Sequence, residues 1–145
     1  MTFVRDMLKG KPQEGIWTIG PEASVLEALK LMDEKDVGAL LVVEEGKLAG
    51  IFSERDYARK GILKGRASKD TPVGEVMTLK VYYVTPERKL EECLALMTQK
   101  HIRHLPVLEE GQLIGVVSIG DAVKAFISDL EFTIQNLEKY INGDR

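Results

Sequence analysis

The segment EEGKLAGIFSERD at residues 44–56 returns as EEGQLIGVVSIGD at residues 109–121. The match extends without a gap when the chain is shifted by 65 residues, and 16 of the 38 positions from residue 21 to residue 58 are identical to their counterparts. Unrelated segments of ordinary composition would share about two or three. The chain therefore contains one unit twice.

Both copies carry the same order of predicted elements. In each, a short extended piece ends at a proline, an amphipathic helix follows, two apolar strands form a hairpin, and a second helix begins at a serine. A unit of about 50 residues buries too little surface to be stable alone. We therefore predict an α/β (α+β) fold of two β-α-β-β-α repeats, paired by a pseudo-twofold axis with their sheets facing inward. The expected strands are residues 17–19, 39–43 and 48–52, with 82–84, 105–108 and 113–117 in the second copy; the first helices start at Val25, capped by Ser24, and at Leu90.

Composition narrows the class of protein. The chain has 145 residues, 44% of them hydrophobic, and a net charge of −3. An acidic balance disfavours general nucleic-acid binding, and no apolar run approaches the roughly 20 residues that span a bilayer. The first residues, MTFVRD, lack an apolar signal segment, and Cys93 is the single cysteine. These features predict a cytoplasmic protein without disulfides or a cysteine-rich zinc site.

The motifs GIFSERD (50–56) and GVVSIGD (115–121), the leader VGEVMT (73–78) and the segments SERDYARK (53–60) and IRHLPV (102–107) resemble the cystathionine β-synthase (CBS) domain family, in particular its small stand-alone bacterial members. The resemblance covers residues 4–127. It implies two CBS repeats paired into one module that often dimerises and binds adenosine nucleotides in the cleft between the repeats. The implied organisation is a first repeat with its leader (1–64), a linker and second leader (65–78), a second repeat (79–127) and a helical extension (128–145).

A Ser-x-x-Asp motif stands where a strand becomes a helix in each copy, as Ser53 with Asp56 and as Ser118 with Asp121. A helix N-terminus offers N–H groups and a positive dipole end to phosphate. The serine hydroxyl can bond a phosphate oxygen, and the aspartate can accept bonds from both ribose hydroxyls. The alternative is a capping box, in which serine and aspartate satisfy the helix N-terminus alone.

By resemblance, two nucleotide sites take residues from both repeats. The first draws on Thr18, Ile19, Val37, Gly38, Ala39, Arg103, His104, Ser118, Ile119, Gly120 and Asp121. The second draws on Ser53, Glu54, Arg55, Asp56, Tyr83, Val84, Thr85 and Ile102, and shares Arg103 and His104. We favour the first site for base and ribose. Gly38 and Ala39 leave room for an adenine, and Gly120 lets a ligand approach the backbone more closely than Arg55 does.

Other reactive side chains have plainer explanations. Arg103 is either a solvated charge or a phosphate ligand. His101 and His104 have no third ligand beside them, so no metal site is expected, and Cys93 aligns with Ala28 as a small core residue. Phosphate-loop and nucleophile-elbow motifs are absent from the sequence. No catalytic residue and no obligatory cofactor are predicted, so the chain is not expected to be an enzyme.

The C-terminal residues Ile127, Leu130, Ile134, Leu137 and Ile141 are spaced 3, 4, 3 and 4 apart. This helix either packs on its own repeat or supports a homodimer.

The leading hypothesis for the whole chain is a sensor of an adenine nucleotide, AMP first and then ATP, ADP or NAD, that acts on a separate, unknown protein. The alternative is a structural or protein-interaction homodimer with vacant clefts.

Overall fold

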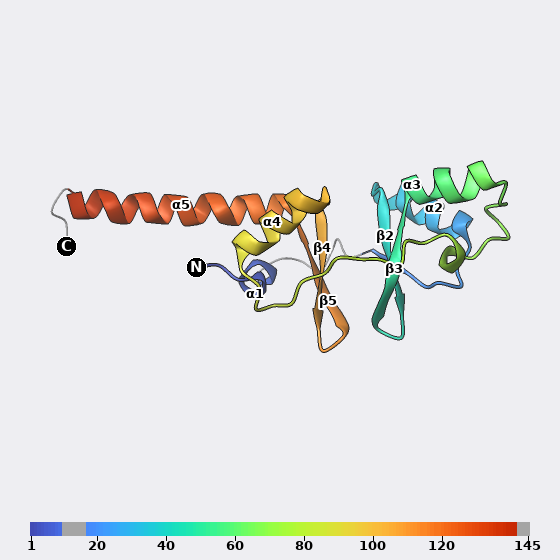
Figure 1. Cartoon of the computed structure of the whole chain (residues 1–145), viewed down its shortest axis with the longest axis horizontal. Helices are drawn as coiled ribbons and strands as arrows, with labels where there is room; N and C mark the ends of the chain where they lie inside the picture. Colours follow the sequence, from blue (N-terminus) through green and yellow to red (C-terminus); the bar gives the residue numbers. More distant parts are fainter. Residues whose placement is uncertain (10–16, 142–145) are drawn as a thin grey trace. The chain divides into compact units, whose positions relative to one another are not determined.

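The computed structural model describes residues 1–9 and 17–141, which form two compact units (Figure 1). The first unit consists of residues 17–82 with 110–113, and the second of residues 1–9, 83–109 and 114–141. Each unit is a small mixed α/β fold, as the sequence predicts. Within the described residues, no helix has the length and apolar character that a membrane span requires.

The first unit contains a parallel strand pair and a hairpin. β1 runs parallel to β2, and β2 pairs antiparallel with β3 so that Leu40 lies opposite Phe52. β3 ends at Ser53, where α3 begins and continues as a π-helical turn and a 3₁₀ turn. The elements are β1 (Thr18–Ile19), α2 (Val25–Lys35), β2 (Ala39–Glu44), β3 (Lys47–Ser53), α3 (Glu54–Asp56), η1 (Tyr57–Gly61), η2 (Ile62–Lys64) and η3 (Val73–Glu75).

The second unit repeats this order but lacks the predicted opening strand. Residues 82–84 form only one parallel bridge, between Val84 and Val107. The prediction of a strand was therefore wrong for the second unit, although Pro86 follows Val84 at the same spacing as Pro21 follows Ile19 of β1. The elements are α1 (Val4–Leu8), α4 (Leu90–Lys100), β4 (His104–Glu109), β5 (Gln112–Ser118) and α5 (Ile119–Ile141).

The hairpin turns explain why Glu-Glu-Gly occurs twice. Glu45 and Gly46 have φ values of 53° and 79°, and Glu110 and Gly111 have 51° and 79°. Positive φ at both central residues is the mark of a type I′ turn, whose twist matches that of the flanking strands. The repeated tripeptide therefore fixes the hairpin register in both units.

The helices start and stop at local signals. The Ser24 hydroxyl accepts from the Glu27 N–H at 3.1 Å, and the Glu27 carboxylate accepts from the Ser24 N–H at 3.3 Å, which confirms the predicted cap. α2 and α4 end at Asp36 and His101, whose φ values are 54° and 55°. His101 thus lies outside the helix, in a different backbone setting from His104 on β4.

The two cores use equivalent positions. In both, one face of the first helix packs against the hairpin, and the valine of a leader segment completes the cluster. The first core contains Val25, Ala28, Met32, Leu40, Val42, Phe52, Val73 and Val76; the buried apolar residues of the second unit are Val4, Val84, Leu90, Cys93, Met97, Leu105, Val107, Val117 and Ala122.

The leaders are exchanged between the sequence repeats. Val73 lies in the core of the first unit, and its N–H donates to the Ala23 carbonyl at 2.8 Å. Val4 lies in the second unit, where its N–H donates to the Arg88 carbonyl at 2.8 Å. Each compact unit is thus closed by the leader that precedes the other repeat in the sequence.

Two glycines make room for these leaders. A Cβ on Gly50 would lie 2.8 Å from both the Met77 sulfur and the Thr78 carbonyl oxygen, and one on Gly115 would lie 2.8 Å from Leu8 Cδ2. The backbone carbonyl of Thr78 therefore leaves no room for a side chain at residue 50, and at residue 115 a side chain would displace Leu8. Met77 and Leu8 occupy matching positions, so the leader exchange follows the same pattern in both units.

Candidate ligand-binding corners

The Ser53–Asp56 corner joins β3 to α3 in the first unit. Asp56 Oδ2 accepts from the Ser53 N–H and from the Ser53 hydroxyl, each at 3.0 Å, and the Asp56 N–H donates to Ser53 Oγ at 3.2 Å. These bonds form a capping box, which is one of the two interpretations of the Ser-x-x-Asp motif; the other is a nucleotide-binding site.

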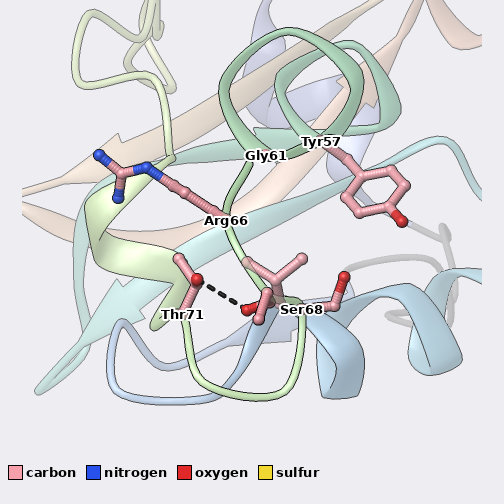
Figure 2. A pocket seen from close by; sticks show the side chains of 7 residues that line it. Tyr57, Gly61, Arg66, Ser68 and Thr71 are labelled. Carbon is pink, nitrogen blue, oxygen red and sulfur yellow. Dashed lines mark hydrogen bonds between the residues drawn. The ribbon is translucent and has the colours of Figure 1, made fainter. Parts of the chain in front are cut away.

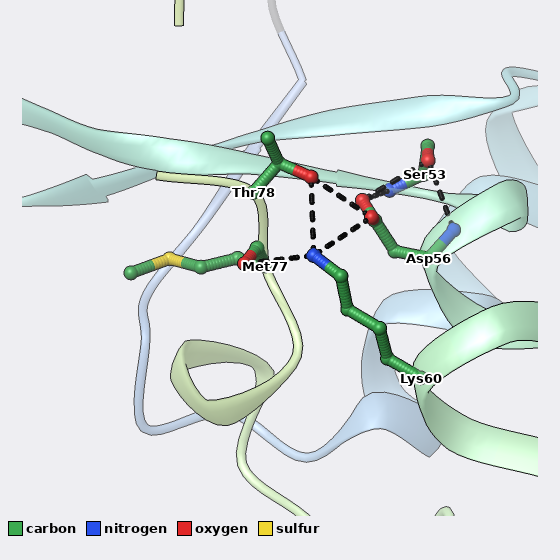
Figure 3. Close-up of polar contacts among 5 residues, drawn as sticks. All are labelled: Ser53, Asp56, Lys60, Met77 and Thr78. Atoms are coloured by element: carbon green, nitrogen blue, oxygen red, sulfur yellow. Dashed lines mark hydrogen bonds and ion pairs between the residues drawn. The ribbon is translucent and has the colours of Figure 1, made fainter. Parts of the chain in front are cut away.

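Asp56 also binds side chains from beyond its own helix start (Figure 3). Its Oδ1 accepts from the Thr78 hydroxyl at 2.9 Å and lies 3.3 Å from Lys60 Nζ. Lys60 Nζ in turn lies 3.3 Å from Thr78 Oγ1 and 3.4 Å from the Met77 carbonyl oxygen. Asp56 is only 7% exposed. Oδ2 therefore closes the capping box with Ser53, and Oδ1 holds the exchanged leader against the first unit through Thr78.

The Ser118–Asp121 corner joins β5 to α5 in the second unit. The Ser118 N–H donates to Asp121 Oδ2 at 2.9 Å, and the Asp121 N–H donates to Ser118 Oγ at 3.1 Å. The Ile119 N–H donates to the Arg103 carbonyl at 2.8 Å. The backbone of Arg103 thus lies at the N-terminus of α5, the 23-residue helix whose positive dipole end favours an anion.

Within the second unit, the structure brings together six of the residues predicted for the favoured site. Ser118, Ile119, Gly120 and Asp121 form the corner, and Arg103 and His104 lead into the adjacent strand β4. Arg103, His104, Ile119 and Gly120 are exposed, and Asp121 is half-buried. The Ser118 hydroxyl, the Asp121 carboxylate and the backbone of Arg103 therefore meet at one helix start.

The two corners differ in what surrounds the aspartate. The residues that match Lys60 and Thr78 in the second copy are Ala125 and Lys9. The surroundings of the two aspartates therefore differ in residue type. Asp121 is also more exposed than Asp56, which makes the second corner the better candidate for a ligand.

The remaining residues of the favoured site belong to the first unit. Thr18 and Ile19 form β1, opposite Leu41 and Val42. Val37, Gly38 and Ala39 lead into β2, and the Gly38 carbonyl accepts from the Glu54 N–H at 3.1 Å. A Cβ on Gly38 would meet nothing nearer than Glu54 at 3.9 Å. These five residues belong to β1 and the start of β2 in their own unit, and Gly38 is exposed.

The second predicted site is likewise divided between the units. Ser53, Glu54, Arg55 and Asp56 lie at the corner of the first unit, where Glu54 and Arg55 are exposed. In the second unit Val84 is buried, Tyr83 is exposed, and Thr85 and Ile102 are half-buried. The sequence analysis missed Lys60 and Thr78. The signal available for Lys60 was its place four residues after Asp56 on a helix, where an ion pair forms readily.

Two hollows lie away from these corners. A crevice of the first unit is lined by Val25, Tyr57, Gly61, Arg66, Ala67, Ser68 and Thr71 (Figure 2). The Thr71 hydroxyl donates to the Ala67 carbonyl at 2.7 Å across one side of it. The crevice is too narrow for a water molecule and is simply the gap beside the η1 turn.

A wider surface hollow of about 300 Å³ lies over α4 and is lined by Tyr83, Val84, Arg88, Glu92, Ala95, Leu96 and Gln99. Its charged groups neutralise each other: Arg88 donates to Glu92 at 2.7 Å, which lowers the pKa of the Glu92 carboxyl. In residues 1–9 and 17–141, no three His, Cys, Asp or Glu side chains are grouped so as to hold a metal ion.

Cys93 lies fully inside the core of the second unit. Burial raises the pKa of its thiol to about 11. Because the thiolate is the reactive form, we expect negligible alkylation by iodoacetamide in the folded protein at pH 8 and full alkylation in 6 M urea. Mass spectrometry of the two samples checks this. Rapid alkylation of the folded chain would show that Cys93 is accessible and would contradict the core assignment.

Comparison with known proteins agrees with the duplicated fold. The CBS domain family matches residues 4–61 and 73–128. The chain is 44% identical over 150 residues to the CBS domain-containing protein CBSX3, mitochondrial, of Arabidopsis thaliana, covering 98% of this chain and 73% of that protein. Two sequence matches and two structural units thus define a tandem-repeat protein. The chain belongs to the CBS domain family.

Solved structures show the same fold. A protein with CBS domains from Burkholderia ambifaria is 54% identical, with a TM-score of 0.76 over 88% of this chain and 96% of that one. A CBS domain pair crystallised in complex with 5′-methylthioadenosine and S-adenosyl-L-methionine is 25% identical, with a TM-score of 0.69 over 89% and 98% of the two chains. The resemblance to the CBS domain family that the repeat and the Ser-x-x-Asp motifs indicate is confirmed.

Proposed function

We propose that the chain is a regulatory module that binds an adenine nucleotide at the Ser118–Asp121 corner, with AMP as the preferred ligand and ATP, ADP or NAD as the others. The observation that carries the proposal is the difference between the corners. The Asp56 residue is only 7% exposed, whereas Asp121 is half-buried next to Gly120 and near Arg103, which are both exposed. The adenosine-type ligands in the related CBS domain pair support the ligand class.

Each group at this corner matches a part of a nucleotide. The Asp121 carboxylate accepts from ribose hydroxyls in a charge-assisted pair of bonds. The Ser118 hydroxyl and the N-terminus of α5 suit phosphate, and the Arg103 guanidinium supplies a fork of donors for the same group. Thr18, Ile19, Val37, Gly38 and Ala39 remain the predicted base-binding residues, and the site at Asp56 remains a weaker prediction.

The output of such a module is a change in how it binds another protein. Ligand binding shifts a conformational equilibrium only as far as its affinities for the two states differ. We propose no catalytic residue, so the signal passes to a separate partner. Incubation with ATP or NAD is expected to give no product. The cytoplasmic location and the homodimeric state remain predictions.

Thermal unfolding in the presence of AMP, ADP, ATP and NAD tests the proposal, with GMP as the matched control for the base. A ligand at 100 times its Kd stabilises the folded state by about 2.7 kcal/mol, so the melting temperature should rise with the logarithm of AMP concentration. No rise with any adenine nucleotide at millimolar concentration would favour the alternative of a ligand-free interaction module.

A further inference from the structure

We propose that α5 forms a parallel two-stranded coiled coil with α5 of a second copy of this chain. This interaction surface is independent of the nucleotide site. It is defined by the apolar stripe of α5, whose members follow one another at spacings of 4 and 3 and are each between 43% and 78% exposed. The stripe consists of Val123, Ile127, Leu130, Ile134, Leu137 and Ile141.

The stripe is not the face that α5 uses against its own unit. Ala122 is buried, and the Thr2 hydroxyl bonds both carboxylate oxygens of Asp129 at 2.9 and 3.0 Å. In a heptad that places Ile127 at position a, Ala122 and Asp129 fall at position c and the half-buried Ala125 falls at position f, which lies opposite the a and d positions. α5 therefore packs on its own unit with one face and leaves the opposite apolar face exposed.

The distal half of α5 has no support from its own unit. Residues 131–141 are all exposed. A helix of this length gains most of its stability from packing an amphipathic face, and isolated segments are marginal in water. The apolar side chains of residues 134, 137 and 141 would contribute to stability only if something covered them. A partner along the whole stripe supplies that packing.

The residue types in the stripe favour pairing with α5 of a second copy in parallel orientation. From Val123 onward isoleucine occupies every a position, as Ile127, Ile134 and Ile141, and the d positions are Val123, Leu130 and Leu137. β-Branched residues at a with leucine at d favour parallel two-stranded coiled coils. Such a partner presents the same stripe in the same register, as an isologous interface requires.

The flanking charges agree with this partner. The e positions are Lys124, Glu131 and Glu138, and the g positions that face them in a parallel pair, five residues earlier, are Ile119, Phe126 and Thr133. No like charges meet across the parallel interface. The polar face of the distal helix is acidic on balance, which disfavours an anionic membrane surface as the occupant.

Sedimentation of the full chain tests the inference. The unaltered chain is expected to sediment at twice its 16.2 kDa. Leu137→Glu is expected to raise the dimer dissociation constant by more than about 100-fold, because two carboxylates would enter the apolar interface. Phe132→Glu is the matched control: it makes the same apolar-to-acidic change on the same helix at a 66%-exposed f position, and should leave the dissociation constant unchanged.

Orientation is tested by oxidation of single-cysteine additions. Leu137→Cys should form a disulfide-linked dimer, because identical d positions face each other in a parallel pair, and Phe132→Cys should not. Far-UV circular dichroism of each variant confirms that the fold is retained. A Leu137→Glu variant with the mass of the unaltered dimer, a monomeric unaltered chain, or failure of Leu137→Cys to crosslink would overturn the inference.

Discussion

Replacing Asp121 with alanine is expected to weaken AMP binding by about 10- to 100-fold. The carboxylate makes charge-assisted bonds to the ribose, and the loss of such bonds costs about 1.5–3 kcal/mol, with 1.4 kcal/mol for each factor of ten. Isothermal titration calorimetry at 25 °C measures the effect. Asp56→Ala is the matched control, because it removes the same group from the other copy, and it should change AMP affinity less.

A second ligand identifies which atoms Asp121 binds. If its carboxylate accepts from the ribose hydroxyls, 2′-deoxy-AMP should bind the unaltered chain more weakly than AMP does, and this preference should disappear in Asp121→Ala. Equal discrimination by both proteins would place Asp121 away from the ribose. The substitution removes the bond from the Ser118 N–H to the Asp121 carboxylate, which is worth about 1 kcal/mol, so the fold should survive it.

Replacing Asp56 with alanine is expected to destabilise the first unit by about 2–4 kcal/mol. The substitution removes a 7%-exposed carboxylate that accepts from Ser53 and Thr78 and pairs with Lys60. It costs one cap and leaves donors without their acceptor. Urea unfolding followed by tryptophan fluorescence measures this unit specifically, because Trp17 is the single tryptophan and packs on the first core.

Two further variants separate the causes of that loss. Lys60→Met should cost less than about 1 kcal/mol, because the Lys60 side chain is 45% exposed and its ion pair is screened by water. Asp121→Ala should leave the Trp17 transition almost unchanged, since Asp121 belongs to the second unit. If Asp56→Ala left the midpoint of that transition where it is, Asp56 would not hold the leader in place.

Much of this molecule could be predicted from its sequence because the duplication repeats each local signal. Ser24 caps α2, the two Glu-Glu-Gly segments form type I′ turns, and the Ser-x-x-Asp motifs fall at strand-to-helix corners. Each of these features depends on residues within four positions of one another. Comparison of the two copies then tests every assignment a second time.

The features that were not predicted depend on contacts between distant parts of the chain. Val4 and Val73 are leaders of similar sequence, so no local pattern shows which repeat each one completes. The bond from Thr78 to Asp56 follows from that exchange and was missed with it. Residues 82–84 have the side chains of a strand, but they form one bridge where the matching residues of the first unit form a two-residue ladder.

A crystal structure of the protein grown with saturating AMP would test the central claim most directly. We predict electron density for the nucleotide at the start of α5, with the ribose hydroxyls on the Asp121 carboxylate and the phosphate near Ser118 and Arg103. Density for AMP only at the Asp56 corner, or no density beside Asp121, would contradict the account.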